Sequence, residues 1–128
     1  MQLFTLLMGR IRLPNRVWYR ANASVLRVNG QFAGFVIMRH TTQPTSEIYM
    51  CALLREFRGK GLGELMIVDA INASVPDGQA VIADCLPASR AMMALLEKIG
   101  FVAEPQENQS PVRRFRFVND RHPMVGAG

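Results

Sequence analysis

The sequence predicts a single domain of the α/β class, with a mixed, mostly antiparallel sheet and two helices packed against it. Three observations support this fold. The dipeptide Asn29-Gly30, the strongest signal for a tight hairpin turn, separates two strand-like segments. The apolar period then changes from strand-like to helical at Gly61. A short apolar strand lies between the two helical segments, so a helical crossover should join two parallel strands.

The length and composition allow one ordinary globular domain. We expect the 128 residues to form a domain over residues 1–118, followed by a flexible tail over residues 119–128. The chain is 49% hydrophobic and 20% charged, which argues against disorder and against a disulfide scaffold. Its apolar runs are far shorter than the roughly 20 residues that a membrane helix requires.

The first half of the chain is predicted to be mainly strands. We expect these strands at residues 1–8, 23–28, 32–39 and 47–54. Residues 9–22 are rich in Arg and are interrupted by Pro14-Asn15, so we expect them to be irregular, with room for at most one short helix. Simple alternation along the fourth strand predicts that Glu47, Tyr49 and Cys51 share one face.

The second half alternates helix and strand. A helix should begin at Gly61 and end before Pro76-Asp77-Gly78, and a second should begin near Ser89 and end at Gly100. Strands are expected at residues 80–85, 101–103 and 112–118. The expected core stripes of the two helices are Leu62, Met66, Ala70 and Ala73, and Met92, Leu95, Leu96 and Ile99. We expect Asp84 to cap the second helix.

The charge is unevenly distributed. The net charge is +5, and residues 1–46 contain six Arg and no acidic residue. Such a basic segment favours an anionic partner, such as nucleotide phosphates, an acidic protein or nucleic acid. A solvated surface that keeps the protein soluble explains the same charges equally well.

Cys51 and Cys85 lie in apolar runs, and no cluster of Cys and His predicts a metal site. Without a recognisable signal peptide, we expect a cytoplasmic protein.

The loop before the first helix carries the strongest chemical signal. Gly59, Gly61 and Gly63 alternate with other residues after a strand, and Arg58 and Lys60 add positive charge. Backbone amides that approach a ligand closely at a helix N-terminus are suited to a pyrophosphate. The loop lacks the P-loop pattern and matches the dinucleotide pattern only in part. It matches fully the acetyl-CoA pattern Q/R-x-x-G-x-G/A.

Two segments resemble motifs of the GCN5-related N-acetyltransferase (GNAT) family. Residues 51–63 resemble its core motif, and Leu95-Leu-Glu-Lys-Ile-Gly-Phe101 resembles its second motif. The resemblance covers roughly residues 23–118 and implies a GNAT-like acyl-CoA N-acyltransferase fold whose parallel strands splay around the cofactor. It implies acetyl-CoA, or another acyl-CoA, as the donor. The implied cofactor-binding residues are Leu53, Leu54, Arg58, Gly59, Lys60, Gly61, Leu62, Gly63 and Ser89.

The resemblance also implies the reaction, which is N-acetyl transfer by direct attack of an amine through a tetrahedral intermediate. A carboxylate base often lies on the strand that contains Glu47, so Glu47 is the first candidate base and Tyr49 the second. Glu47 as a solvated residue at a strand end is the simpler alternative. The family often has a Tyr acid where this chain has Leu96, and Tyr19, Tyr49 or water are possible substitutes. Ser89 replaces a frequent Asn and keeps a hydrogen-bonding group.

The acceptor side is the least defined. Residues 9–22 occupy the place where family members usually have two helices, which implies either an open cleft or one completed by a second subunit in a homodimer. The acceptor is expected to be an amine-bearing small molecule, peptide or protein. If Arg10, Arg12, Arg16 and Arg20 line its approach, they favour an acidic acceptor. The alternatives are a non-catalytic CoA-binding or regulatory domain and, more weakly, a basic nucleic-acid-binding domain.

Overall fold

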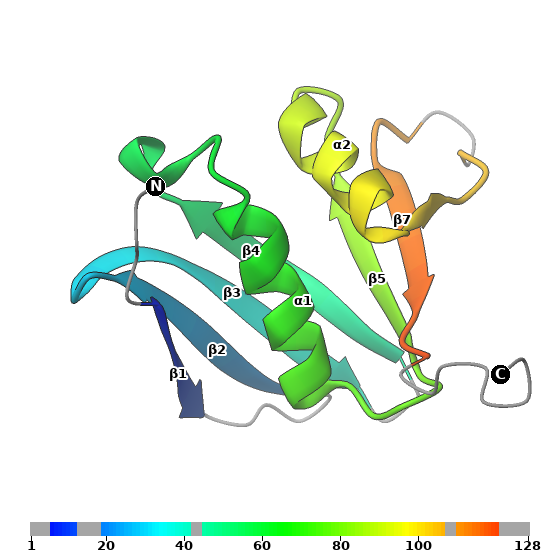
Figure 1. Ribbon diagram of the computed structural model, residues 1–128. Helices are drawn as coiled ribbons and strands as arrows, with labels where there is room; N and C mark the ends of the chain where they lie inside the picture. The colour runs from blue at the N-terminus through cyan, green and yellow to red at the C-terminus, as the bar shows by residue number, and fades with distance from the viewer. Residues whose placement is uncertain (1–5, 13–18, 42–44, 107–109, 121–128) are drawn as a thin grey trace, which may run out of the picture.

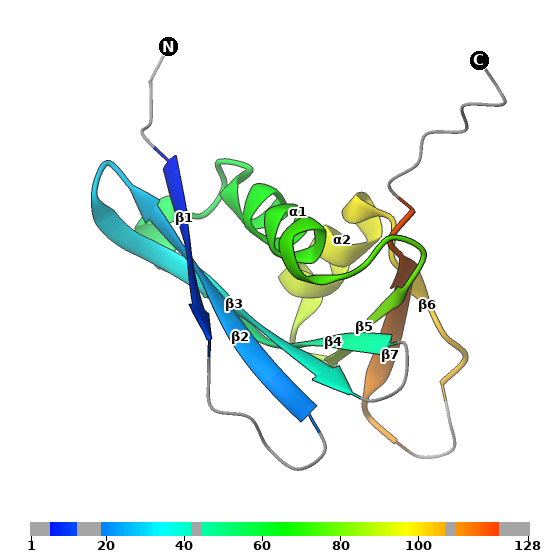
Figure 2. The same ribbon diagram turned by 90° about the horizontal axis from the view of Figure 1, so that it is seen from below.

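The computed structural model describes residues 6–12, 19–41, 45–106 and 110–120, which form one seven-stranded sheet covered on one face by two helices (Figures 1 and 2). The strands are β1 (Leu6–Arg12), β2 (Tyr19–Val28), β3 (Gln31–Thr41), β4 (Thr45–Leu53), β5 (Ala80–Cys85), β6 (Val102–Ala103) and β7 (Arg113–Val118). The helices are α1 (Leu62–Ser74) and α2 (Arg90–Ile99), and a 3-10 turn, η1 (Arg55–Phe57), precedes α1.

The sheet has the order β1-β2-β3-β4-β5-β7-β6, and β4 and β5 form its parallel pair. This confirms the predicted mixed sheet with a helical crossover between two parallel strands. The parallel ladder runs from Thr45↔Ala80 to Ile48↔Ala83 and then stops. Beyond it the two strands separate, as Figure 1 shows, and we call this opening the fork.

The hairpin between β2 and β3 forms at the predicted dipeptide. Asn29 has φ 50° and Gly30 has φ 81°, the two left-handed residues that a type I′ turn requires. The first two strands differ from the prediction in their extent. β1 covers residues 6–12 because its antiparallel pairing with β2 continues to Arg12↔Asn22. β2 begins at Tyr19, which pairs with Thr41 of β3. Ladder hydrogen bonds use backbone groups alone, so Arg side chains did not prevent strand formation there. Residues 1–5 and 13–18 lie outside the described residues.

A β-bulge interrupts β4 just before the fork. Ile48 pairs with Met38 and Met50 pairs with Ile37, which leaves Tyr49 as the extra residue. An extra residue reverses the alternation of the side chains that follow it. Beyond Tyr49, the faces to which the β4 side chains point can therefore no longer be read from simple alternation along the strand.

The bulge corrects one prediction. Cys51 pairs with Val36, which is fully buried beneath the helices, whereas Glu47 pairs with Arg39 on the opposite face. The expectation that Glu47, Tyr49 and Cys51 share one face was therefore wrong. Cys51 faces the helices, and Glu47 faces away from them.

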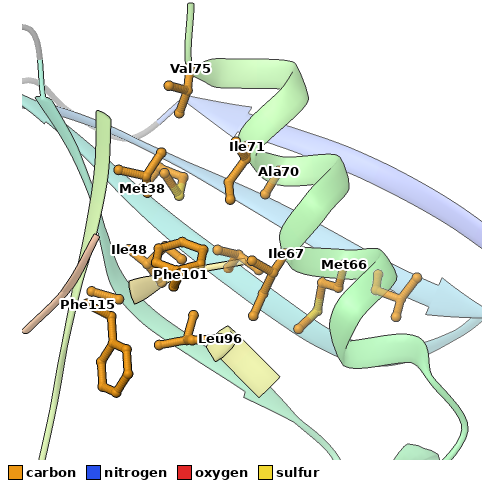
Figure 3. Close-up of a cluster of buried hydrophobic side chains, with 14 of the residues drawn as sticks. Met38, Ile48, Met66, Ile67, Ala70, Ile71, Val75, Leu96, Phe101 and Phe115 are labelled. Carbon is orange, nitrogen blue, oxygen red and sulfur yellow. The ribbon is translucent and has the colours of Figure 1, made fainter. Parts of the chain in front are cut away.

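The hydrophobic core lies between the helices and the sheet (Figure 3). From α1, the buried side chains are Leu62, Met66, Ile67, Ala70 and Ile71. Ile71 takes the place predicted for Ala73, which is exposed. From α2, Leu96 alone is fully buried, and the other residues of its predicted stripe are partly buried against the core. Burial of a side chain such as Met or Leu contributes about 1.5–3 kcal/mol.

The opposite face of the sheet has no helix in the described part of the chain (Figure 2). Tyr49, Met50 and Val118 are exposed. We call this the open face. None of the described helices has both the length and the apolar character needed to cross a membrane.

The ordered domain continues past residue 118. Asn119, which we had assigned to the tail, is only 3% exposed, and its amide nitrogen donates to the carbonyl oxygen of Val75 at 2.9 Å. Its backbone N–H also donates to the carbonyl of Gln79. Asn119 therefore packs against the domain through its side chain and its backbone, and residues 121–128 lie outside the described residues.

Candidate functional site

The fork leaves one edge of β4 without a partner strand. The N–H of Leu54 donates to Ala33 of β3 at 2.8 Å, and its carbonyl accepts from Phe57 at 2.9 Å. Since successive residues of a strand direct their backbone groups to opposite edges, the N–H and C=O of Leu53 face the fork. Of the two residues predicted to pair with a pantetheine arm, Leu53 is the one whose backbone is turned to the opening.

A mostly apolar cavity of about 320 Å³ occupies the fork on the helix face. Its walls come from β4, α1 and α2, and include Cys51, Met66, Met92 and Leu95. The thiol sulfur of Cys51 lies 3.9 Å from the sulfur of Met92, so the two chain segments meet across the cavity. Burial raises the pKa of the Cys51 thiol to about 11, with a smaller contribution from Cys85. Cys51 is therefore an uncharged wall of the cavity at neutral pH.

The loop between β4 and α1 closes one end of the cavity. Gly59 and Gly61 have φ values of 76° and 78°, which L side chains rarely adopt. Gly61 is the N-cap of α1, and no side chain caps the helix there. The first helical hydrogen bond runs from Leu65 N–H to the Gly61 carbonyl, so the amides of residues 62–64 have no partner within the helix. Free amides and the helix dipole together form an anion site.

The third glycine of the loop serves packing. A Cβ atom on Gly63 would lie 3.1 Å from a methyl group of Leu95, so only glycine allows α1 and α2 to approach this closely without adjustment. An ion pair between Lys98 and Glu64, at 3.3 Å, also joins the two helices.

The positive side chains of the loop are exposed. Arg58 lines the cavity, and its Nε donates to the Leu53 carbonyl at 2.8 Å. Lys60 lies beside the α1 N-terminus. Of the predicted cofactor residues Arg58 to Gly63, Arg58 and Gly63 line the apolar cavity, and Lys60 adds a second positive charge to the loop between them. This arrangement fits a ligand with an apolar arm joined to a phosphate group.

The two candidate base residues lie on the open face and share one partner. Arg39 contacts the Glu47 carboxylate with two of its nitrogens, and its Nε donates to Oε1 at 2.7 Å. The same guanidinium carbon lies 4.0 Å from the centre of the Tyr49 ring, a cation–π contact. The sequence analysis did not single out Arg39. Its position opposite Glu47 follows only from the β3–β4 register.

The structure also places the remaining candidates. Ser89 is the N-cap of α2, forms no capping side-chain hydrogen bond and does not line the cavity. Leu96 is fully buried in the core, so no hydroxyl reaches the fork from this position. Asp84 does not cap α2, contrary to our prediction. Arg114 instead donates two hydrogen bonds to it, at 2.8 and 2.9 Å, and this contact lowers the pKa of Asp84.

The described residues contain no cluster of three or more Asp, Glu, His or Cys side chains that could bind a metal ion. The side chain of Tyr19, a possible substitute acid, lies outside the described part of the structure. Glu47, Tyr49 and Asp84 lie on the open face around the fork, where Arg39 contacts the first two and Arg114 contacts the third.

A splayed parallel pair, followed by a glycine-rich loop and an uncapped helix, defines the class of acyl-CoA N-acyltransferase folds. The chain belongs to the acetyltransferase (GNAT) family, whose sequence model matches residues 8–101. No curated protein matches this sequence closely enough to be recognised as a relative.

Solved structures support the fold. The IAA acetyltransferase from Bacillus cereus ATCC 14579 is 18% identical, with a TM-score of 0.65 and 77% of each chain covered. A Bacillus subtilis acetyltransferase in complex with CoA is 19% identical, with a TM-score of 0.65 and coverage of 77% of this chain and 76% of that one. The Salmonella typhimurium protein yncA with its cofactor acetyl-CoA is 19% identical, with a TM-score of 0.64 and coverage of 81% and 66%.

Proposed function

We propose that this protein is an N-acetyltransferase that uses acetyl-CoA, or another acyl-CoA, and transfers the acyl group to an amine by direct attack. The observation that carries the proposal is the apolar cavity in the fork, which ends at the uncapped N-terminus of α1. Two of the structural neighbours contain CoA or acetyl-CoA, which supports the same donor here. The free thiols of Cys51 and Cys85 fit a reducing compartment, and we propose the cytoplasm.

The geometry supports a binding role for each part of the site. The amides of residues 62–64, together with Arg58 and Lys60, would hold the pyrophosphate. The backbone groups of Leu53 at the fork would hydrogen-bond the pantetheine arm, while the apolar walls exclude water from it. When bound, the acyl-CoA supplies a thioester carbonyl as the electrophile. Holding donor and amine in contact supplies much of the rate in such a transfer.

The acceptor amine must lose a proton before or during the attack. Glu47 is our first candidate base, and Tyr49 is the second. Both lie on the open face beside the point where β4 and β5 separate. Arg39 would orient the Glu47 carboxylate through their ion pair and hold the Tyr49 ring in place. Leu96 donates no proton, so the thiolate would leave either unassisted or with help from Tyr49 or water.

A non-catalytic domain that binds CoA is the second candidate function. The buried Leu96 favours it, because the usual acid of the family is missing at that position. The position of Ser89 outside the cavity favours it as well. Binding of acetyl-CoA without transfer to any amine is the result that would establish this alternative.

The experiment is a calorimetric titration of acetyl-CoA into the protein and two matched variants. Gly61→Glu introduces a negative charge at the α1 N-cap, where φ is 78° and a Cβ meets no atom within 4 Å. Gly78→Glu makes the same change at φ 82°, again in open space, beyond the other end of α1. The two variants therefore carry the same backbone strain and the same added charge. They differ only in which end of α1 the substitution lies near.

We expect the wild type and Gly78→Glu to bind acetyl-CoA with similar affinity, and Gly61→Glu to lose binding. Equal loss in both variants would point to strain, and no binding by the wild type would overturn the proposal. A turnover assay with a panel of amines then separates the enzyme from the non-catalytic alternative.

A further inference from the structure

Two contacts made by α2 mark the ends of the cavity in the fork. At the loop end, a methyl group of Leu95 lies 3.1 Å from the position that a Cβ on Gly63 would take, beside the α1 N-terminus. About one helical turn earlier in α2, the sulfur of Met92 lies 3.9 Å from the thiol sulfur of Cys51. α2 therefore runs along the cavity, with Leu95 at the loop end and Met92 at the far end.

β4 gives the cavity the same direction. Its lining begins at Leu53, which is hydrogen-bonded to Arg58 of the loop, and continues through Ala52 to Cys51. Two residues of a strand span about 7 Å, so Cys51 lies about that much further from the loop than Leu53 does. The contact between Cys51 and Met92 thus joins the two walls of the cavity at the end away from the anion site.

The walls beyond the loop are mostly fixed by packing. Cys51 pairs with Val36, which is fully buried, and Met66 and Ile67 are at most 1% exposed. Side chains packed in this way resist displacement by a larger group. Met92 is the movable part of the far end, because it is only partly buried and its unbranched side chain has three rotatable bonds.

The far end also differs from the loop end in charge. Among the described residues that line the cavity, Arg58 alone is charged at neutral pH, and it belongs to the loop. The Cys51 thiol, whose pKa is raised by burial, is uncharged. A carboxylate at the far end would lose its water without gaining a cationic partner, which is unfavourable.

We infer that Met92 is a specificity-determining residue for the donor, and that its contact with Cys51 restricts the acyl group to short, uncharged ones such as acetyl and propionyl. The inference rests on the proposed function, in which the loop holds the pyrophosphate and Leu53 pairs with the pantetheine arm. Because Leu53 is followed along the cavity by Cys51, the Met92 side chain lies where the acyl end of such an arm is directed.

The test measures the binding of donors that differ in the acyl group, by calorimetry in the absence of any amine acceptor. The compounds are free CoA, acetyl-CoA and hexanoyl-CoA. We expect the wild type to bind hexanoyl-CoA about 10- to 100-fold more weakly than acetyl-CoA, because the added methylene groups would overpack the far end.

Met92→Ala should remove most of this difference, because the shortened side chain no longer reaches Cys51. Met93→Ala is the matched control, since Met93 is also partly buried against the core but does not line the cavity. It should keep the wild-type preference. If Met92→Ala does not fold, Met92→Val keeps more apolar bulk, still withdraws the side chain from Cys51, and should reduce the preference in the same direction.

Free CoA separates a role in specificity from a general structural one. Met92→Ala should bind free CoA as tightly as the wild type does, because free CoA lacks the acyl group that meets Met92. A loss of affinity for free CoA as large as the change for hexanoyl-CoA would show a general disruption of the site and would overturn the inference.

The preference for an uncharged acyl group has its own comparison. Malonyl-CoA and propionyl-CoA have the same number of acyl carbons, and malonyl-CoA ends in a carboxylate. The wild type should bind malonyl-CoA at least about 10-fold more weakly, because the far end offers no cationic partner. Equal or tighter binding of malonyl-CoA would overturn this part of the inference.

The two proposals fail in distinguishable ways. If the wild type binds neither free CoA nor any acyl-CoA, the proposed function fails and the inference fails with it. If the wild type binds acetyl-CoA and hexanoyl-CoA equally, or if the preference survives Met92→Ala, the CoA site stands and the role of Met92 does not.

Discussion

The Nε of Arg58 donates a hydrogen bond to the backbone carbonyl of Leu53, at 2.8 Å, on the open edge of β4. In this arrangement a residue of the anion loop occupies a backbone acceptor of the open β4 edge. A ligand that uses both the loop and the edge must compete with this contact. Arg58 therefore has two opposing effects on binding, because it attracts the phosphate end and blocks an acceptor for the arm.

The first prediction separates these two effects. Arg58→Ala should weaken the binding of acetyl-CoA by about 5- to 20-fold, because charge-assisted contacts to a phosphate contribute about 1–2 kcal/mol. Acetyl-pantetheine, which lacks the pyrophosphate, should bind the variant no more weakly than it binds the wild type. Calorimetry with both ligands is the measurement. Arg116→Ala, on the open face, is the control, and a parallel loss for the two ligands would contradict the assignment.

The second prediction concerns the base. Glu47→Gln should lower kcat about 100-fold with little change in the KM for acetyl-CoA, the usual scale for loss of a general base. Tyr49→Phe keeps the ring under Arg39 and removes the hydroxyl alone, so it should lower kcat less. Steady-state kinetics across a pH series are the measurement. A larger loss in Tyr49→Phe than in Glu47→Gln would reverse the order of the two candidates.

The third prediction follows from the raised pKa of Cys51. Burial disfavours the thiolate, which is the reactive form, and moves the pKa from 9.0 to about 11. Labelling of Cys51 in a Cys85→Ala variant should therefore be about 100-fold slower at pH 7 than labelling of the urea-unfolded chain. The rate should rise about tenfold per pH unit between pH 7 and 10. A rate that levels off near pH 9 would mean that the thiol titrates normally.

The fourth prediction concerns the contact between β3 and β4. A Cβ on Gly34 would lie 2.5 Å from the carbonyl oxygen of Ala52, which real side chains do not tolerate. Gly34→Ala should lower the free energy of unfolding by about 2–3 kcal/mol, because the strands must shift apart. Gly9→Ala, also in a strand, meets no atom within 4 Å and should change it by less than about 1 kcal/mol. Urea denaturation measures both, and equal effects would exclude a steric cause.

Local signals in the sequence were sufficient for several elements. The Asn29-Gly30 turn was predictable because its two positive φ values favour those residue types. The loop around Gly61 was predictable because both its backbone conformation and its pattern of residues are local. α1 begins within one residue of the prediction, and β5 has the predicted bounds.

The features that sequence reasoning missed depend on pairing between distant residues. The bulge at Tyr49 is a property of the β3–β4 register, and nothing in the spacing of β4 alone marks it. Asp84 has a typical capping position in the sequence, but its partner Arg114 is 30 residues away. Arg39 acquires its role in the same way, from neighbours that only the folded sheet supplies.

At the fork, backbone hydrogen-bonding groups of β4 are left without a partner strand inside the sheet. A bound acyl donor would pair with them as an additional strand would. A ligand that binds the folded chain alone stabilises it by about 1.4 kcal/mol for each tenfold excess of free ligand over its Kd. The lifetime of this small domain in a cell would then follow the concentration of its own donor. Starvation for the donor would remove the activity and also leave the domain easier to unfold and degrade.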